Sequence, residues 1–237
     1  MSFVKDQQNV RSQGVYYSAG LRNYLVKVYN YMAMALGITG IVAFFTASSQ
    51  TIMSAVYGTP LQWLIVFLPI ILVSVMSYKL HSLSFQSIIT IFVSFSALMG
   101  ISLSYIFVLY TAESIARVFF ITAAMFGAMA LYGNNTKHDL TKLGSFLMMG
   151  VIGLIIASLV NLFLGSHPLQ FAISLITVVM FTLMTAYDAQ RIKDLYYQFN
   201  DGSEIATNKL AIMGSTSLYF NFINIFLSLL RLFGDRK

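Results

Sequence analysis

Long apolar runs without charge recur along the whole chain, and they constrain the fold more than any other feature of the sequence. Between Lys27 and Lys79, for example, no residue is charged. Only 9% of the 237 residues are charged, against about 25% in an ordinary soluble domain, and 58% are hydrophobic. Because so little charge cannot cover a soluble surface, we expect one polytopic membrane domain. A nucleic-acid-binding protein and a soluble enzyme are excluded.

Seven apolar segments follow Leu25, each near the roughly 20 residues that a helix needs to cross the hydrocarbon of a bilayer. They predict an all-α fold with membrane-spanning helices at 25–47, 61–78, 85–109, 116–133, 143–165, 169–188 and 209–232. Residues 1–24 have no continuous apolar core, so we expect a polar amino-terminal arm and not a cleavable signal peptide. Residues 25–237 then form a single seven-helix transmembrane domain.

The Lys and Arg residues fall mostly on one side of these spans. The amino-terminal side would hold ten of the 14, namely Lys5, Arg11, Arg22, Lys27, Lys79, Lys137, Lys142, Arg191, Lys193 and Lys209. The other side would hold Arg117, Arg231, Arg236 and Lys237. Cytoplasmic loops are richer in Lys and Arg, so the amino terminus is predicted to be cytoplasmic. Because the carboxyl tail then carries three cations outside, a last segment that enters the membrane and returns is an alternative.

Small and polar residues recur at steps of three or four along the last span, which places them on one helical face. They are Gly214, Ser217, Asn221, Asn224, Ser228 and Arg231. Turned towards lipid, this face would leave two carboxamides without partners, so we expect it to face the protein interior or a water-filled cavity. Two roles are open: hydrogen bonds between helices, worth roughly 0.6–2 kcal/mol each, or the lining of a functional cavity.

Asp188 is the acidic residue at the polar end of the sixth span. It is either a helix-end residue paired with Arg191 at i+3, or a buried titratable group that could act as a switch. Lys79 closes the second span, where it either extends to the lipid head groups or turns inwards as a partner of Asp188.

The remaining ionisable residues favour structural roles. Asp139 lies in a possible capping box that opens the fifth helix, with Lys142 as its i+3 partner, and Glu113 and Arg117 form an i,i+4 pair at a membrane boundary. No zinc site is expected, because cysteine is absent and the three histidines are scattered; these are His81, His138 and His167.

Several motifs, taken together and in order, resemble the bacterial branch of the Bax inhibitor-1 family, also known for its transmembrane Bax inhibitor motif. The resemblance covers nearly the whole chain and is carried by residues 20–22, 28–33, 100–104, 136–140, 187–193 and 217–226. It implies seven helices with the last one surrounded by the other six, and a location in the bacterial inner membrane.

Bacterial members of this family resemble pH-sensitive calcium leak channels, in which aspartates of the sixth and seventh helices share a proton and an arginine competes for one of them. Here Asp188 matches the first aspartate, Asn221 replaces the second, and Lys79 replaces the arginine. The resemblance therefore implies a calcium or other cation pathway gated by Asp188 against Asn221. The residues expected along it are Asp188, Asn221, Lys79, Asn224, Ser217, Ser228 and Arg191.

The amide of Asn221 can donate a hydrogen bond to Asp188 and offer an oxygen to a hard cation, so these two residues are the possible calcium ligands. An amide cannot release a proton, so the pair should respond less to pH. Asn221 also cannot act as the second acid of an intramembrane aspartyl protease, and we expect neither an enzyme nor a tightly bound cofactor. The alternative function, which also fits the bacterial family that the chain resembles, is a non-conducting regulator. It would bind an ATP-dependent membrane protease or another membrane partner through the amino-terminal arm.

Overall fold

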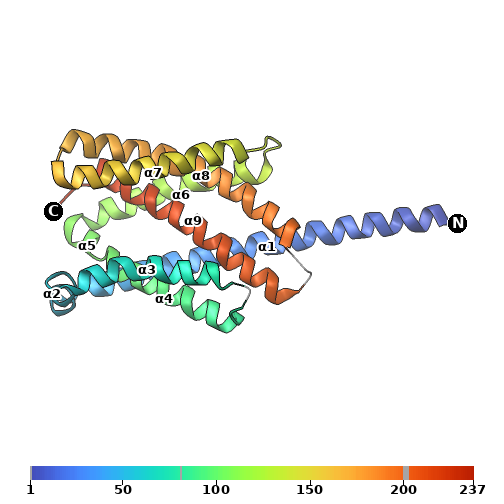
Figure 1. Cartoon of the computed structure of the whole chain (residues 1–237), viewed down its shortest axis with the longest axis horizontal. Helices are drawn as coiled ribbons and strands as arrows, with labels where there is room; N and C mark the ends of the chain where they lie inside the picture. Colours follow the sequence, from blue (N-terminus) through green and yellow to red (C-terminus); the bar gives the residue numbers. More distant parts are fainter. Residues whose placement is uncertain (1, 81, 200–202) are drawn as a thin grey trace.

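The computed structural model describes residues 2–80, 82–199 and 203–237, with side chains described from Ala19 onward (Figure 1). His81 and the side chains of Lys5 and Arg11 lie outside the described residues. The helices are α1 (Ser2–Ala47), α2 (Gln50–Tyr57), α3 (Leu61–Tyr78), α4 (Phe85–Leu103), α5 (Tyr105–Leu109), α6 (Ala112–Asn135), α7 (Thr141–Leu164), α8 (His167–Phe199) and α9 (Glu204–Phe233).

Seven helical segments are long and apolar enough to cross a membrane, which confirms the all-α polytopic membrane fold. Two boundaries differ from the sequence prediction. The segment 1–24 is not separate from the first span, because α1 begins at Ser2 and continues without a break to Ala47. Helix α8 continues to Phe199, so Asp188 lies about three turns before its end and not at the end.

The third span is interrupted at Ser104, between α4 and α5. The hydroxyl of Ser104 donates a hydrogen bond to the carbonyl of Ile101 at 2.8 Å, and the hydroxyl of Tyr57, from α2, donates to the same carbonyl at 2.9 Å. Side chains that bond to helix carbonyls in this way compete with the backbone ladder and bend or end a helix. The polar residues at this end of the third span therefore mark a break held by α2.

Helix α9 occupies the centre of the bundle, which it crosses diagonally (Figure 1). In its most apolar stretch 67% of residues are buried, against 11 to 39% in the other six spans. It packs most closely on α8, α1 and α6, and less on α4, so the expectation that all six other helices surround it is met only in part. The chain starts and ends at opposite ends of the bundle, so the alternative in which the last segment enters and returns is wrong.

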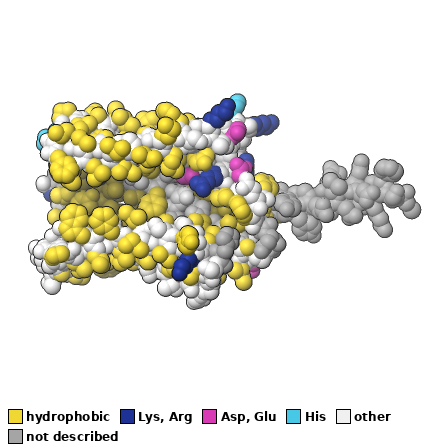
Figure 2. Space-filling model, in the orientation of Figure 1, with side chains coloured by type: hydrophobic (Ala, Val, Ile, Leu, Met, Phe, Trp, Pro, Cys, Tyr) yellow, Lys and Arg dark blue, Asp and Glu magenta, His cyan; other side chains and the backbone are white. Residues whose placement is uncertain are grey.

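On the face drawn in Figure 2, hydrophobic side chains cover the side of the bundle, while charged side chains gather near the end where α1 enters. This distribution is expected of a membrane protein whose sides face lipid and whose charged end lies at one membrane boundary. The face drawn in Figure 2 thus agrees with the unequal division of Lys and Arg in the sequence.

Glycines allow the helices to approach closely, which matters because apolar burial drives helix association only weakly inside a membrane. A Cβ atom on Gly133 of α6 would collide with the carbonyl oxygen of Ala186 of α8. A Cβ atom on Gly100 of α4 would lie 2.7 Å from the carbonyl oxygen of Thr39 of α1. The α6–α8 contact lies two residues from Asp188, so it helps to place that side chain.

We predict that Gly133→Ala lowers the stability of the protein by about 1–3 kcal/mol, because the added methyl group forces two backbones apart. The matched control is Gly127→Ala on the same helix, where a Cβ atom meets nothing within 4 Å. The thermal unfolding midpoint in detergent measures both. Equal midpoints for the two variants would show that the close approach of α6 and α8 is not needed.

Candidate functional site

Asp188 of α8 and Asn221 of α9 form a buried polar pair. The Asn221 Nδ2 atom donates a hydrogen bond to Asp188 Oδ2 at 2.7 Å. The two residues are only 7% and 3% exposed, and Asp188 is the one charged residue that is buried among those the structure describes. A buried carboxylate is costly unless hydrogen bonds satisfy it, and the Asn221 carboxamide supplies one such bond.

The other partners considered for Asp188 lie elsewhere. Arg191, one turn further along α8, is exposed and contributes an attractive charge without forming an ion pair with Asp188. The helix-end pairing of Asp188 with Arg191 is therefore wrong, because α8 continues past both residues. Lys79 is exposed at the end of α3 and does not contact Asp188 in the described part of the chain, so its inward-turned alternative is wrong as well.

The polar face of α9 borders a cavity of about 400 Å³ between α7, α8 and α9. Asn224, Ser228 and Arg231 line it, and Thr177 lines it from α8. The amide of Asn224 donates to the carbonyl of Phe220 in its own helix at 2.8 Å, so its side-chain oxygen is not engaged by that bond. Ser217 is half-buried and is not among the lining residues. The cavity thus reaches the turn of α9 next to Asn221.

A second buried polar contact holds the opposite side of α9, and sequence reasoning missed it. The hydroxyl of Thr39 on α1 lies 2.9 Å from that of Tyr219 and donates to the carbonyl of Ser96 on α4 at 2.9 Å. Tyr219 precedes Asn221 by two residues, which is about 200° around a helix. The only signal in the sequence was Thr39 itself, one polar residue within a long apolar run.

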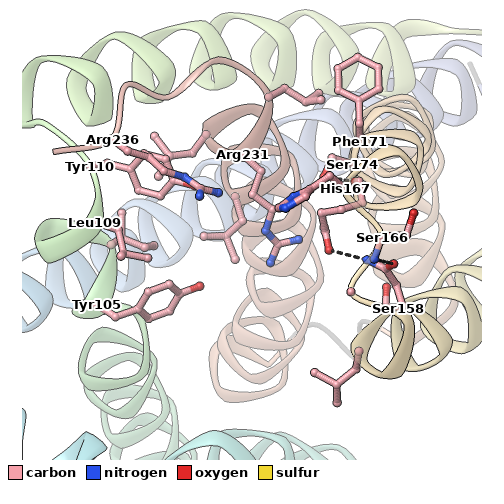
Figure 3. Close-up of a pocket in the computed structure, with 18 residues that line it drawn as sticks. Tyr105, Leu109, Tyr110, Ser158, Ser166, His167, Phe171, Ser174, Arg231 and Arg236 are labelled. Atoms are coloured by element: carbon pink, nitrogen blue, oxygen red, sulfur yellow. Dashed lines mark hydrogen bonds between the residues drawn. The ribbon is translucent and has the colours of Figure 1, made fainter.

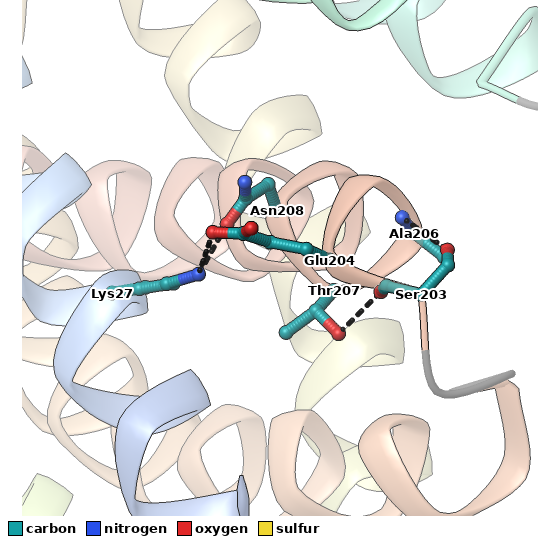
Figure 4. A network of polar contacts seen from close by, with 6 residues as sticks. All are labelled: Lys27, Ser203, Glu204, Ala206, Thr207 and Asn208. Carbon is teal, nitrogen blue, oxygen red and sulfur yellow. Dashed lines mark hydrogen bonds and ion pairs between the residues drawn. The ribbon is translucent and has the colours of Figure 1, made fainter.

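The amino-terminal end of α9 is anchored to α1 and to the loop before α4. The ammonium group of Lys27 donates to Asn208 Oδ1 at 2.8 Å and pairs with Glu204 at 3.3 Å (Figure 4). The ammonium group of Lys209 donates to the carbonyl of Leu83 at 2.6 Å. These contacts fix the start of α9 at the strongly charged end of the bundle.

The opposite end of α9 is anchored to α6 through Asp235, just beyond the helix. Arg117 binds the Asp235 carboxylate at 2.8 Å, and the hydroxyl of Ser114 accepts a hydrogen bond from the Asp235 N–H at 2.9 Å. The predicted pairing of Arg117 with Glu113 is therefore wrong, since the carboxyl tail offers Arg117 a nearer carboxylate.

Asp139 has the structural role that was expected, although its partners differ. Its Oδ1 atom accepts a hydrogen bond from the N–H of Thr141 at 2.9 Å, at the start of α7. Hydrogen bonds from the Thr141 hydroxyl and N–H hold the pKa of Asp139 below its ordinary value. Lys142, the expected i+3 partner, contributes an attractive charge but forms no ion pair with Asp139 among the described residues. Nor do the described residues contain a group of three or more His, Cys, Asp or Glu that could hold a metal ion.

Fold and site together define a polytopic α-helical membrane protein with a buried carboxylate–amide pair between its last two helices. Comparison with known proteins identifies the family: residues 21–237 match the family described as inhibitor of apoptosis-promoting Bax1, and the chain belongs to it.

Bacterial relatives cover nearly the full chain. An uncharacterized protein of Rickettsia prowazekii, RP147, is 46% identical over 93% of this chain and 93% of its own. The inner membrane protein YbhL of Escherichia coli K12 is 41% identical over 92% of this chain and 94% of its own.

We predict that Asn221→Leu destabilises the protein by about 1–3 kcal/mol, because it leaves the buried Asp188 carboxylate without its donor while roughly preserving side-chain volume. Asn224→Leu is the matched control and should cost under about 1 kcal/mol, since its amide bonds only within α9. Chemical unfolding in detergent measures both variants. In an Asp188→Leu background the effect of Asn221→Leu should largely vanish; an unchanged effect would mean that the two residues are not coupled.

Proposed function

We propose that this protein is a pH-modulated leak pathway for calcium or another cation, closed by the hydrogen bond between Asp188 and Asn221. The observation that carries the proposal is the position of this pair. It joins α8 to α9 at 2.7 Å, one turn of α9 away from the cavity that Asn224 and Ser228 line. A buried charge at such a position in a membrane protein is most often functional.

The available oxygen atoms suit a hard divalent cation. Calcium prefers carboxylate, carboxamide and carbonyl oxygens, which Asp188, Asn221 and Asn224 supply along one line of the bundle. Two side chains are too few for a tight calcium site, which takes six to eight oxygens. The cation is therefore proposed as a transient, transported ion, with Asp188 and Asn221 as passing ligands and water completing its shell.

The expected pH response depends on the chemical groups that surround the Asp188 carboxylate. The contacting residue of α9 is an asparagine, α6 presents the uncharged Gly133 nearby, and Arg191 of α8 supplies an attractive charge that acts on the carboxylate. An ionised Asp188 accepts a charge-assisted hydrogen bond from Asn221, and protonation weakens that bond without creating repulsion. Changing the pH thus adjusts the strength of the closure, but does not force the two helices apart.

Calcium flux into dye-loaded proteoliposomes, at one acidic and one alkaline pH, tests the proposal. Asp188→Ala removes the closing contact and should raise the flux at both pH values. Asn221→Asp should make the flux rise steeply with pH, because two carboxylates share a proton in acid and repel each other once both are ionised. A coupling of about 1–3 kcal/mol corresponds to a 5- to 150-fold change. If both variants conduct calcium at the wild-type rate at both pH values, the pair does not gate the pathway.

A second candidate, from a different class, is a non-conducting regulator that binds an ATP-dependent membrane protease. The feature that favours it is the polar amino-terminal segment, which forms the start of α1 and continues into the first span. Removing residues 2–18 should then abolish co-purification with the protease and leave calcium flux unchanged. Asp188→Ala should do the reverse, so the two variants separate the candidates.

For location we propose the bacterial inner membrane, with a cytoplasmic amino terminus. The name of the Escherichia coli relative supports the membrane, and the ten Lys and Arg residues on the amino-terminal side support the orientation.

A further inference from the structure

A cavity of about 570 Å³ lies at the end of the bundle that carries the carboxyl terminus, between α5, α7, α8 and α9 (Figure 3). Arg231, in the last turn of α9, and Arg236, in the tail that follows, both project into it. Ser166 and His167, at the start of α8, line the facing wall. The chain therefore brings two guanidinium groups from one segment against the amino-terminal end of another helix.

Among the described residues, neither arginine has a partner for its charge. None of the described residues that line the cavity is acidic, and neither guanidinium forms an ion pair or a hydrogen bond with the described part of the protein. Arg117, at the same end of the bundle, shows the contrast, because it is bound to Asp235 at 2.8 Å. A pair of free guanidinium groups is a good receptor for a phosphate, whose oxygens match their planar fork of donors. The positive end of the α8 dipole adds to the attraction.

The cavity continues into an apolar one. The cavity of about 400 Å³ described above shares Ser158, Leu162, Leu227 and Arg231 with it. Beyond these residues its walls are mostly aliphatic, with Val151, Leu154, Ile155 and Ile173 from α7 and α8. A cationic chamber at a membrane boundary that opens into an aliphatic one suits a molecule with an anionic head and a hydrocarbon chain.

We propose that this double cavity binds an anionic phospholipid, with its phosphate between Arg231 and Arg236 and an acyl chain along α7 and α8. A free phosphate would satisfy the arginines but would leave the aliphatic chamber without a matching ligand. The acyl chain would lie in the cavity that Asn224 and Ser228 also line, so a bound lipid would compete with the proposed cation pathway, and lipid binding is therefore tested without measuring ion flux. The lipid site accounts for two cations at the end of the bundle that is otherwise poor in them.

The test uses the full-length protein in a neutral detergent and follows its thermal unfolding midpoint. Three additives are titrated: a short-chain phosphatidylglycerol, the phosphatidylcholine with the same chains, and inorganic phosphate. We expect a saturable rise in the midpoint with phosphatidylglycerol only. Each arginine near a membrane surface is worth about 1 kcal/mol towards an anionic lipid, so Arg231→Gln with Arg236→Gln should weaken binding about 30-fold.

Lys237→Gln is the matched control, since it removes one charge from the same tail outside the cavity, where the ammonium group donates to the carbonyl of Phe107. It should bind phosphatidylglycerol as the wild type does. The proposal is overturned if phosphatidylcholine raises the midpoint as much as phosphatidylglycerol does, or if inorganic phosphate does so. It is also overturned if Lys237→Gln weakens the binding of phosphatidylglycerol as much as the double variant does. Should the double variant fail to fold, native mass spectrometry of the wild type decides: retention of both lipids alike overturns the proposal, and selective retention of phosphatidylglycerol supports it.

Discussion

A carboxylate buried within a membrane-spanning bundle must find a donor from the protein, because lipid supplies none. Asp188 finds it in Asn221, and that requirement determines much of the surrounding structure. Helix α8 has to continue past Asp188 for the side chain to be enclosed, and α9 has to cross the centre of the bundle to present its carboxamide. The polar face of α9 and the depth of the cavity beside it follow from the same arrangement.

The position of α9 is fixed by contacts of different chemical kinds along its length. At its two exposed ends, α9 is held by the ionic contacts of Lys27 and Asp235. In its buried middle, it is held by the hydroxyl contact of Tyr219 and the carboxamide contact of Asn221. Charge pairs at exposed ends are individually weak, whereas buried hydrogen bonds are costly to break. The middle of the helix is therefore the part on which a chemical change in one side chain has the greatest effect.

The sequence was sufficient for the number of spans, because apolar runs mark hydrocarbon, and for the polar face of α9, because a step of three or four residues marks a helical face. The pairing of Asp188 with Asn221 was implied only by the family resemblance. The sequence was insufficient for features that neither an apolar run nor a periodic face marks. Hydropathy does not distinguish the polar turns of α8 up to Phe199 from a loop, so the sequence left open whether Asp188 lies at a helix end or is buried. The pairing of Arg117 with Asp235 and the contact of Thr39 with Tyr219 join segments far apart in the chain, and single residues carry no periodic signal of such a partner.

The near-contact of the α6 and α8 backbones at Gly133 has a mechanical consequence. Any side chain at Gly133 would push the two helices apart at this point, so glycine there keeps the turn of α8 that carries Asp188 close against α6. Helix α6 holds the carboxyl tail through Arg117, and that tail forms one wall of the arginine-lined chamber. Helix α6 thus joins two features of the structure, because it contacts α8 beside the buried carboxylate and holds the tail at the arginine-lined chamber through Arg117.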